Sequence, residues 1–225
     1  MLVQIEGVLT ADEVAHCRSV LERLDWADGR ATAGTQSAEA KHNLQVPQDA
    51  PEARDLGEMI LGALGKNPTF VSAGLPLRVY PPLFNRYDAG MAFGAHVDNS
   101  IRFAGPVRYR TDLSATLFLS DPDDYDGGEL IVEDTYGEHA VKLAAGDLIL
   151  YPASSQHRVA PITRGSRWAA FFWAQSMVRS DERRALLYEM DGAIQALTPM
   201  VGQTAAPVIS LTGLYHNLIR MWADV

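Results

Sequence analysis

Hydrophobic positions follow two different periods along this chain: helical spacing near both ends and a period of two in between. Thr10 and Glu13 form a capping-box pattern, and an apolar stripe follows them, which predicts a helix over residues 11–25. Pro51 opens a second amphipathic stretch, so we expect another helix over residues 51–64. The polar residues 28–48 between these helices show no sustained period. They predict a long loop, which in a compact domain is often functional.

From residue 76 onward, short apolar runs alternate with turn signals such as Asp-Ala-Gly and Asp-Gly-Gly. We expect strands over residues 77–87, 92–97, 113–120, 129–133, 140–143, 147–151, 157–162 and 168–175. Short strands at this spacing favour a mainly β fold with a double-stranded β-helix (jelly-roll) core.

Helical spacing returns after Ser180, and a last helix is expected near residues 210–223. The chain is thus divided into a helical region with a polar loop over residues 1–75, a jelly-roll domain over 76–178 and a helical extension over 179–225. Helices at both ends of the chain would suit a homodimer.

Composition limits the classes of partner. The formal net charge is -9 and no run of Lys or Arg occurs, which argues against binding to nucleic acid. No segment approaches the ~20 continuous apolar residues of a membrane span. Cys17 is the single cysteine, so an internal disulfide and a thiolate metal cluster are excluded, and its place on an apolar stripe predicts a buried thiol. The N-terminus lacks a signal-peptide pattern, so a cytoplasmic location is expected.

The most informative chemistry is the pair His96 and Asp98, followed by His157 and then by Arg167. Residues two apart on a strand share a face, so His96 and Asp98 can bind one ion together. Two imidazoles and one carboxylate form the facial triad that holds Fe(II) and leaves three positions open. An Arg can hold the distal carboxylate of a 2-oxoglutarate cosubstrate through two parallel hydrogen bonds. This order predicts an Fe(II)- and 2-oxoglutarate-dependent oxygenase, with iron at His96, Asp98 and His157.

Further expectations concern neighbouring residues. Arg167 is expected to begin a strand after a turn at residues 163–166, with His157 about five residues down the neighbouring strand. Arg158 and Arg164 are expected to be solvated.

Structural zinc is disfavoured because no fourth ligand is at hand. Residues 121–126 suggest a calcium loop but lack the glycine and the glutamate that such a loop requires.

The polar loop contains a cluster that could contact a substrate above the iron, or could simply be solvated. Its members are Gln36, Lys41, His42, Asn43 and Gln45.

Several long motifs resemble one known family. They are NRYDAGMAFGAHVDN at residues 85–99, RTDLSATLFLSD at 110–121, YDGGEL at 125–130, YPASS at 151–155 and YHNL at 215–218. Together they resemble the prolyl-4-hydroxylase-type branch of the 2-oxoglutarate oxygenases, and more closely the bacterial PKHD-type hydroxylases. The similarity covers nearly the whole chain.

This resemblance implies a hydroxylase that uses Fe(II), O2 and 2-oxoglutarate, releases succinate and CO2, and needs L-ascorbate to rescue oxidised iron. It places Tyr87 beside the cosubstrate, although a buried wall residue is equally compatible, and it offers Ser114 or Thr116 as a second hydroxyl that holds 2-oxoglutarate. The family is found near iron-uptake functions, and the substrate could be a protein residue or a small molecule. Two alternatives stay open: a non-catalytic iron- or 2-oxoglutarate-binding sensor, and a metal-dependent cupin isomerase, which would not need Arg167.

Overall fold

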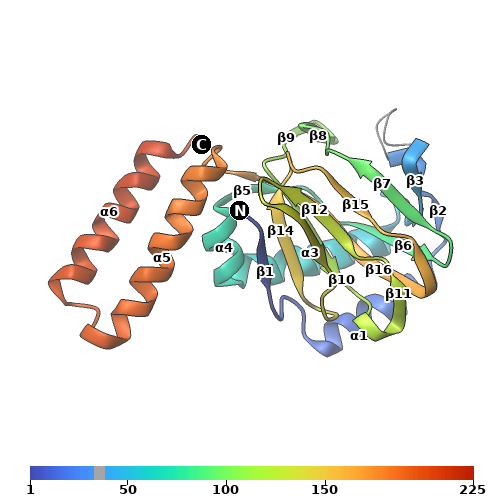
Figure 1. Cartoon of the computed structure of the whole chain (residues 1–225), viewed down its shortest axis with the longest axis horizontal. Coiled ribbons are helices and arrows are strands. Elements are labelled where there is room, and N and C mark those ends of the chain that lie inside the picture. Colours follow the sequence, from blue (N-terminus) through green and yellow to red (C-terminus); the bar gives the residue numbers. More distant parts are fainter. Residues whose placement is uncertain (33–38) are drawn as a thin grey trace.

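Two facing β-sheets form the centre of the protein in the computed structural model, which describes residues 1–32 and 39–225 (Figure 1). The larger sheet contains β1 (Val3–Ile5), β14 (Leu148–Pro152), β10 (Leu113–Phe118), β16 (Ile162–Ser176), β6 (Leu83–Asp88), β4 (Leu44–Gln45) and β2 (Ala27–Asp28), with β5 (Pro76–Val79) and β11 (Tyr125–Gly127) also paired to β16. The smaller sheet runs in the order β13 (Gly137–Val141), β12 (Leu130–Asp134), β15 (His157–Val159), β7 (Ala92–His96) and β3 (Lys41–His42). A separate hairpin joins β8 (Ile101–Ala104) to β9 (Val107–Arg110).

This arrangement confirms the predicted jelly-roll core, and it differs from the predicted strands in detail. The run expected over residues 77–87 divides into β5 and β6, because Pro81 and Pro82 interrupt it and proline cannot donate to a strand ladder. Part of the predicted loop over residues 28–48 is paired: β3 extends the smaller sheet, while β2 and β4 extend the larger one. These short strands place residues 41–45 beside β7 of the smaller sheet and β6 of the larger one.

Strand β16 corrects the expected turn at residues 163–166. Those residues belong to one 15-residue strand that pairs with β11, β10 and β6. Gly165 has a φ of +73°, and a Cβ there would meet the Asp124 carbonyl oxygen at 2.1 Å, so this glycine allows β11 to pack closely. His157 therefore does not lie on a strand adjacent to Arg167; β15 and β16 belong to opposite sheets.

Helices cover the outer face of the larger sheet. They are α1 (Ala11–Leu21), α3 (Pro51–Lys66) and α4 (Pro68–Gly74), and the last of these was not predicted. The capping box of Thr10 and Glu13 is present, and α1 ends at Leu21, four residues earlier than expected. One apolar cluster joins Leu21 of α1 and Ile60 of α3 to Phe172 of β16, so these helices share the core of the sheet. Short 3-10 turns, η1 (Gly29–Thr32) and η2 (Pro122–Asp124), lie in two connections.

The Cys17 thiol is fully buried in this cluster, as predicted, and burial raises its pKa to about 11. Since the thiolate is the reactive form, the folded protein at pH 8 is expected to be inert to a thiol-specific reagent. Titration with such a reagent should detect no thiol in the native protein and one after denaturation. A native thiol that reacts as fast as free cysteine would contradict the packing of α1.

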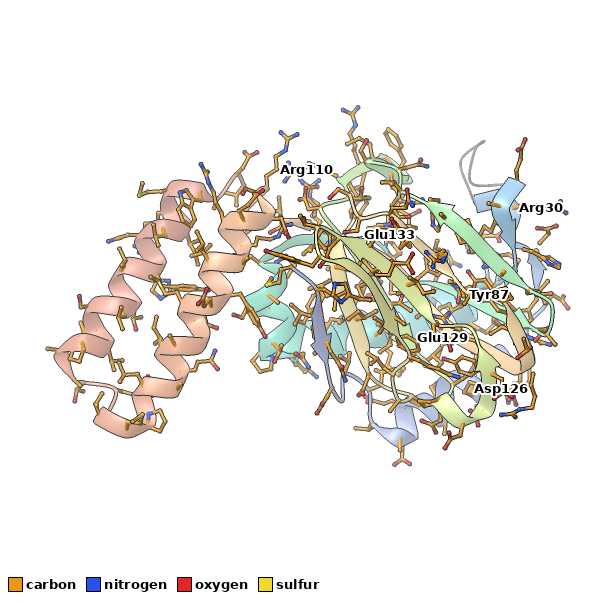
Figure 2. All side chains as sticks on the ribbon, viewed as in Figure 1. Arg30, Tyr87, Arg110, Asp126, Glu129 and Glu133 are labelled. Atoms are coloured by element: carbon orange, nitrogen blue, oxygen red, sulfur yellow. The ribbon has the colours of Figure 1, made fainter. Side chains whose placement is uncertain are left out.

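The chain ends in a helical hairpin of α5 (Asp181–Val201) and α6 (Ala206–Trp222), which extends away from the β core (Figure 1). Leu187 packs against Leu75 and Val178 at its base, while other apolar side chains stay exposed, among them Met200, Ile209 and Met221. Within the described residues, no helix has both the length and the apolar character needed to cross a membrane. Figure 2 shows Arg30 and Arg110 at the periphery of the β core, whereas Tyr87 is buried within it.

Candidate active site

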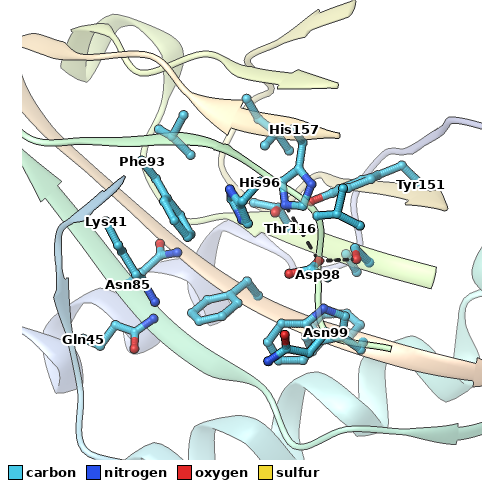
Figure 3. A pocket seen from close by; sticks show the side chains of 18 of the residues that line it. Lys41, Gln45, Asn85, Phe93, His96, Asp98, Asn99, Thr116, Tyr151 and His157 are labelled. Carbon is cyan, nitrogen blue, oxygen red and sulfur yellow. Dashed lines mark hydrogen bonds and ion pairs between the residues drawn. The ribbon is translucent and has the colours of Figure 1, made fainter. Parts of the chain in front are cut away.

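Three side chains from the smaller sheet and its edge converge in the interior. Strands β7 and β15 are paired so that His96 lies directly opposite His157, and Asp98 follows two residues after His96. The potential ligand atoms of these three residues all lie within 4.8 Å of one another (Figure 3). The predicted triad is thus assembled at one point, as a two-histidine, one-carboxylate metal site requires.

Backbone carbonyl groups fix the orientation of both imidazoles. His96 Nδ1 lies 2.8 Å from the Gly94 carbonyl oxygen, and His157 Nδ1 lies 3.1 Å from the Ser155 carbonyl oxygen. When each Nδ1–H donates to its carbonyl, each Nε2 is left with a lone pair for a metal ion. His157 Nε2 lies 3.7 Å from Asp98 Oδ2, which places both atoms toward the same centre.

The charge state of His96 suits a metal ligand. Burial and the neighbouring His157 lower the pKa of His96 to about 4, so its imidazole is neutral at physiological pH. The rings of Phe93 and His96 stack with centroids 3.7 Å apart, which holds the imidazole plane in place.

Ser114 contacts a candidate metal ligand directly. Its hydroxyl donates to Asp98 Oδ2 over 2.6 Å, from the facing strand β10. This contact orients the carboxylate, a task that the resemblance did not assign to Ser114. Its expected part in holding 2-oxoglutarate stays a prediction.

We expect Ser114→Ala to weaken metal binding by about 10- to 100-fold, because it removes a hydrogen bond that orients a metal-binding carboxylate. Calorimetric titration with Zn(II) or anaerobic Fe(II) measures this change. Ser154→Ala, at an exposed serine, is the matched control and should retain the wild-type affinity. A variant that loses affinity for 2-oxoglutarate while it keeps metal affinity would contradict this role.

A cavity of about 740 Å³, including the solvent at its mouth, joins the triad to Arg167. Arg167 is only 1% exposed, and its guanidinium carbon lies 5.0 Å from the ring centre of Phe118 and 5.6 Å from that of Tyr87. Among the described residues, its Nε atom has no hydrogen-bond partner. A buried guanidinium in aromatic surroundings is costly without an anion, so this end of the cavity is suited to a carboxylate.

Two other predicted cosubstrate residues, Tyr87 and Thr116, line the same cavity. Tyr87 lies opposite Arg167 in the β6–β16 register, and burial raises the pKa of its hydroxyl to about 12, which keeps it protonated. Thr116 projects from β10 next to Tyr151, whose pKa burial raises well above its usual value. Tyr87 thus offers a neutral hydroxyl group near Arg167, and Thr116 offers another elsewhere in the lining of the cavity. Arg158 and Arg164 lie outside the cavity in ion pairs with Glu138 and Asp126.

The polar loop also contributes to the lining of the cavity. Lys41 and Gln45 are buried and line it, whereas His42 is exposed, and Gln36 lies outside the described residues. Part of the predicted cluster thus lines the cavity, while Asn43 is buried outside that lining, and contact of the loop with a substrate stays a prediction.

Arg102 also lines the cavity and was missed by the sequence analysis. Its guanidinium carbon stacks 3.8 Å from the ring centre of Trp173, and it comes from the β8–β9 hairpin. The alternating sequence on both sides of Gly105-Pro106 is the signal that predicts this hairpin.

The donor set fits an Fe(II) ion and 2-oxoglutarate. Two neutral imidazoles and one carboxylate suit iron, and a buried guanidinium in the same cavity suits the far carboxylate of a dicarboxylate. Half of the lining residues beyond the triad are aromatic or amide-bearing, so the cavity can also hold an organic molecule.

Comparison with known proteins agrees with this chemistry. Residues 82–175 match the 2OG-Fe(II) oxygenase superfamily, and residues 181–224 match the PKHD-type hydroxylase C-terminal domain. A PKHD-type hydroxylase of Methylobacterium nodulans is 59% identical over 227 residues, covering 100% of both chains. The chain belongs to the PKHD-type hydroxylases. It is a dioxygenase of the hydroxylase type, and this family depends on Fe(II) and 2-oxoglutarate.

Solved structures share the fold of this PKHD-type hydroxylase. A Pseudomonas putida prolyl-4-hydroxylase is 22% identical, with a TM-score of 0.51, and the match covers 78% of this chain and 92% of that protein's chain. HygX from Streptomyces hygroscopicus, with nickel and 2-oxoglutarate bound, is 19% identical, with a TM-score of 0.56. The match covers 79% of this chain and 84% of the HygX chain. At this level of identity the likeness concerns the jelly-roll fold.

Proposed function

We propose that this protein hydroxylates a C–H bond of an organic substrate, with Fe(II) bound by His96, Asp98 and His157 and 2-oxoglutarate bound by Arg167. The observation that carries the proposal is a single cavity with three converging metal donors and, on the opposite sheet, a buried guanidinium. No other part of the described chain combines these features.

Each residue has a distinct task in this proposal. The carbonyl oxygens of Gly94 and Ser155 hold the Nδ1 protons, so both imidazoles bind the ion through Nε2. Arg167 neutralises the 5-carboxylate of 2-oxoglutarate in a site from which the sheets exclude water. The bound iron supplies the oxidising chemistry, driven by O2 and by conversion of 2-oxoglutarate into succinate and CO2.

Further parts of the proposal concern the setting of the reaction. We infer that L-ascorbate restores iron that has oxidised without hydroxylating substrate, and that the reaction takes place in the cytoplasm in connection with iron uptake. The exposed apolar side chains of α5 and α6 support a homodimer formed through this hairpin. Light scattering coupled to gel filtration tests the dimer.

The decisive experiment measures succinate formed from 2-oxoglutarate by anaerobically reconstituted Fe(II) protein after O2 is admitted. The proposal expects O2-dependent succinate even without the substrate, at a slow rate, with ascorbate prolonging the turnover. Tight binding of iron and 2-oxoglutarate without any succinate, in the presence of candidate substrates as well, would instead indicate a sensor. Failure to bind iron would overturn the proposal as a whole.

A further inference from the structure

The three candidate metal ligands are not held in the same way. His96 is paired within β7 and His157 within β15, and both strands belong to the smaller sheet. Asp98 lies beyond the end of β7, which stops at His96, and the residues on either side of it, Val97 and Asn99, are exposed. Residues outside a strand ladder are held less firmly than residues within one, so the position of Asp98 must depend on other contacts.

Thr111 binds the segment that follows Asp98 through two hydrogen bonds, which we call the Thr111 clamp. Its hydroxyl donates to the Asn99 carbonyl oxygen over 2.7 Å, and its backbone N–H donates to the Ser100 carbonyl oxygen over 3.0 Å. Thr111 is 8% exposed, so water competes little for these bonds. The clamp lies at the base of the β8–β9 hairpin, which leaves the metal site after Asp98 and returns to it at β10.

The clamp is itself attached to the larger sheet. Asp112, the residue after Thr111, donates its backbone N–H to the Ala174 carbonyl oxygen of β16 over 3.1 Å. Its carboxylate accepts from the Ser176 N–H over 2.8 Å and from the Arg110 guanidinium over 2.7 and 3.0 Å. The segment after Asp98 is therefore held from the larger sheet, whereas both imidazoles are held by the smaller one.

The Thr111 clamp also supports the bond from Ser114 to Asp98. That bond joins residues 16 apart in sequence, with the whole β8–β9 hairpin between them. Without the clamp, forming it would close a loop that includes the hairpin, and a longer loop costs more entropy to close. The clamp leaves only short free segments on either side of the hairpin. It thereby limits how far the Asp98 carboxylate can move from the two imidazoles.

We propose that Thr111 is a positioning residue for the metal site: through the Asn99 carbonyl group, its hydroxyl keeps Asp98 within reach of the ion that the two imidazoles bind. The ion would then lie between the two sheets, with its imidazole ligands fixed by one and its carboxylate ligand fixed by the other. This inference rests on the proposed function, because it assumes that the triad binds the ion. Thr111 is not among the residues that line the cavity, so its role is separate from contact with substrate or cosubstrate.

The test compares Thr111→Val, which keeps the shape of the side chain but lacks the hydroxyl, with Thr111→Ser, which keeps the hydroxyl. Calorimetric titration with Zn(II) gives the metal affinity, and the visible absorption of the Co(II)-loaded protein reports the ligands and geometry around the ion. Thr111→Val should bind Zn(II) about tenfold more weakly, because changes to groups that orient metal ligands typically cost about 10- to 100-fold. Its Co(II) absorption at saturating metal should differ from that of the wild type, whereas Thr111→Ser should match the wild type in both measurements.

Thr198→Val is the matched control. The Thr198 hydroxyl donates to the Ile194 carbonyl oxygen over 2.7 Å within α5, so this variant loses the same kind of bond at the same length away from the cavity. It should keep the wild-type Zn(II) affinity and Co(II) absorption. Thermal unfolding without metal measures what each lost bond costs the fold. If Thr111→Val does not fold, Thr111→Ala takes its place with the same expectation.

Unchanged Zn(II) affinity and Co(II) absorption in Thr111→Val would overturn the inference, even with a lower unfolding temperature, because a purely structural role predicts that result. A Thr111→Ser protein as defective as Thr111→Val would overturn it too, as would an equal loss of affinity in Thr198→Val. Failure of the wild-type protein to bind Zn(II) or Co(II) would instead overturn the proposed function.

Discussion

Replacing Arg167 by Met is expected to raise the dissociation constant for 2-oxoglutarate by about 100- to 1,000-fold, because a bidentate pair between buried charges is worth roughly 3–4 kcal/mol. The guanidinium is 1% exposed and is surrounded by the rings of Tyr87 and Phe118, so water cannot replace it effectively. Titration of the Zn(II)-loaded protein with 2-oxoglutarate measures the change, and the Michaelis constant for 2-oxoglutarate in the succinate assay should rise in parallel.

The stability of the ligand-free protein separates this role from a structural one. Arg167 makes no ion pair within the described residues, and its Nε has no hydrogen-bond partner there. Removing the guanidinium therefore breaks no salt bridge and no hydrogen bond of Nε. Arg167→Met should therefore unfold at the same temperature as the wild type, or higher, when no ligand is present. Arg164→Met, on the same strand but exposed and paired with Asp126, is the control and should bind 2-oxoglutarate normally. A large drop in the unfolding temperature of Arg167→Met, with unchanged 2-oxoglutarate affinity, would contradict the assignment.

The fold was predictable wherever the sequence pattern within a segment agreed with how that segment packs against the rest of the protein. The capping box at Thr10 and the apolar stripe after it specify α1, and the alternating runs between residues 113 and 151 specify β10, β12 and β14. The long strand β16 was interrupted in the prediction because residues 163–166 have the composition of a turn. Its continuity depends on β11, which packs against Gly165 from a distant part of the chain, and no periodicity within β16 can reveal that partner.

The candidate site was likewise predictable in part: some of its features follow from local sequence, and others depend on packing between distant segments. His96 and Asp98 lie two residues apart, so the period of a strand predicts that they point the same way, and this holds although β7 ends at His96. Their meeting with His157 depends on the β7–β15 register, which places His96 opposite His157 and which the spacing of the motif does not specify. The bond from Ser114 to Asp98 and the approach of Lys41 to Phe171 cross between segments that are far apart in sequence. Residue types predicted the chemistry of the site, whereas the neighbours that tune it required three-dimensional packing.

Replacing His157 by Ala is expected to weaken Fe(II) and Zn(II) binding by more than about 100-fold, since even changes to groups that only orient metal ligands cost about 10- to 100-fold. His157 contributes one of three donors, and the two that remain, His96 and Asp98, cannot form the facial set that iron requires. Succinate formation should fall to the background of metal-free protein. Anaerobic calorimetry and the O2-dependent succinate assay measure the two effects.

His139→Ala is the matched control for this change. His139 lies on β13 of the same sheet, is about half exposed and contacts Asp134 at the surface, so its loss should leave metal binding and turnover unaltered. Circular dichroism should show that both variants keep the wild-type content of strands and helices. Because the β7–β15 pairing uses backbone groups, His157→Ala is expected to remove the donor and retain the sheet. A folded His157→Ala protein that still binds iron with wild-type affinity and forms succinate would show that the reaction centre lies elsewhere.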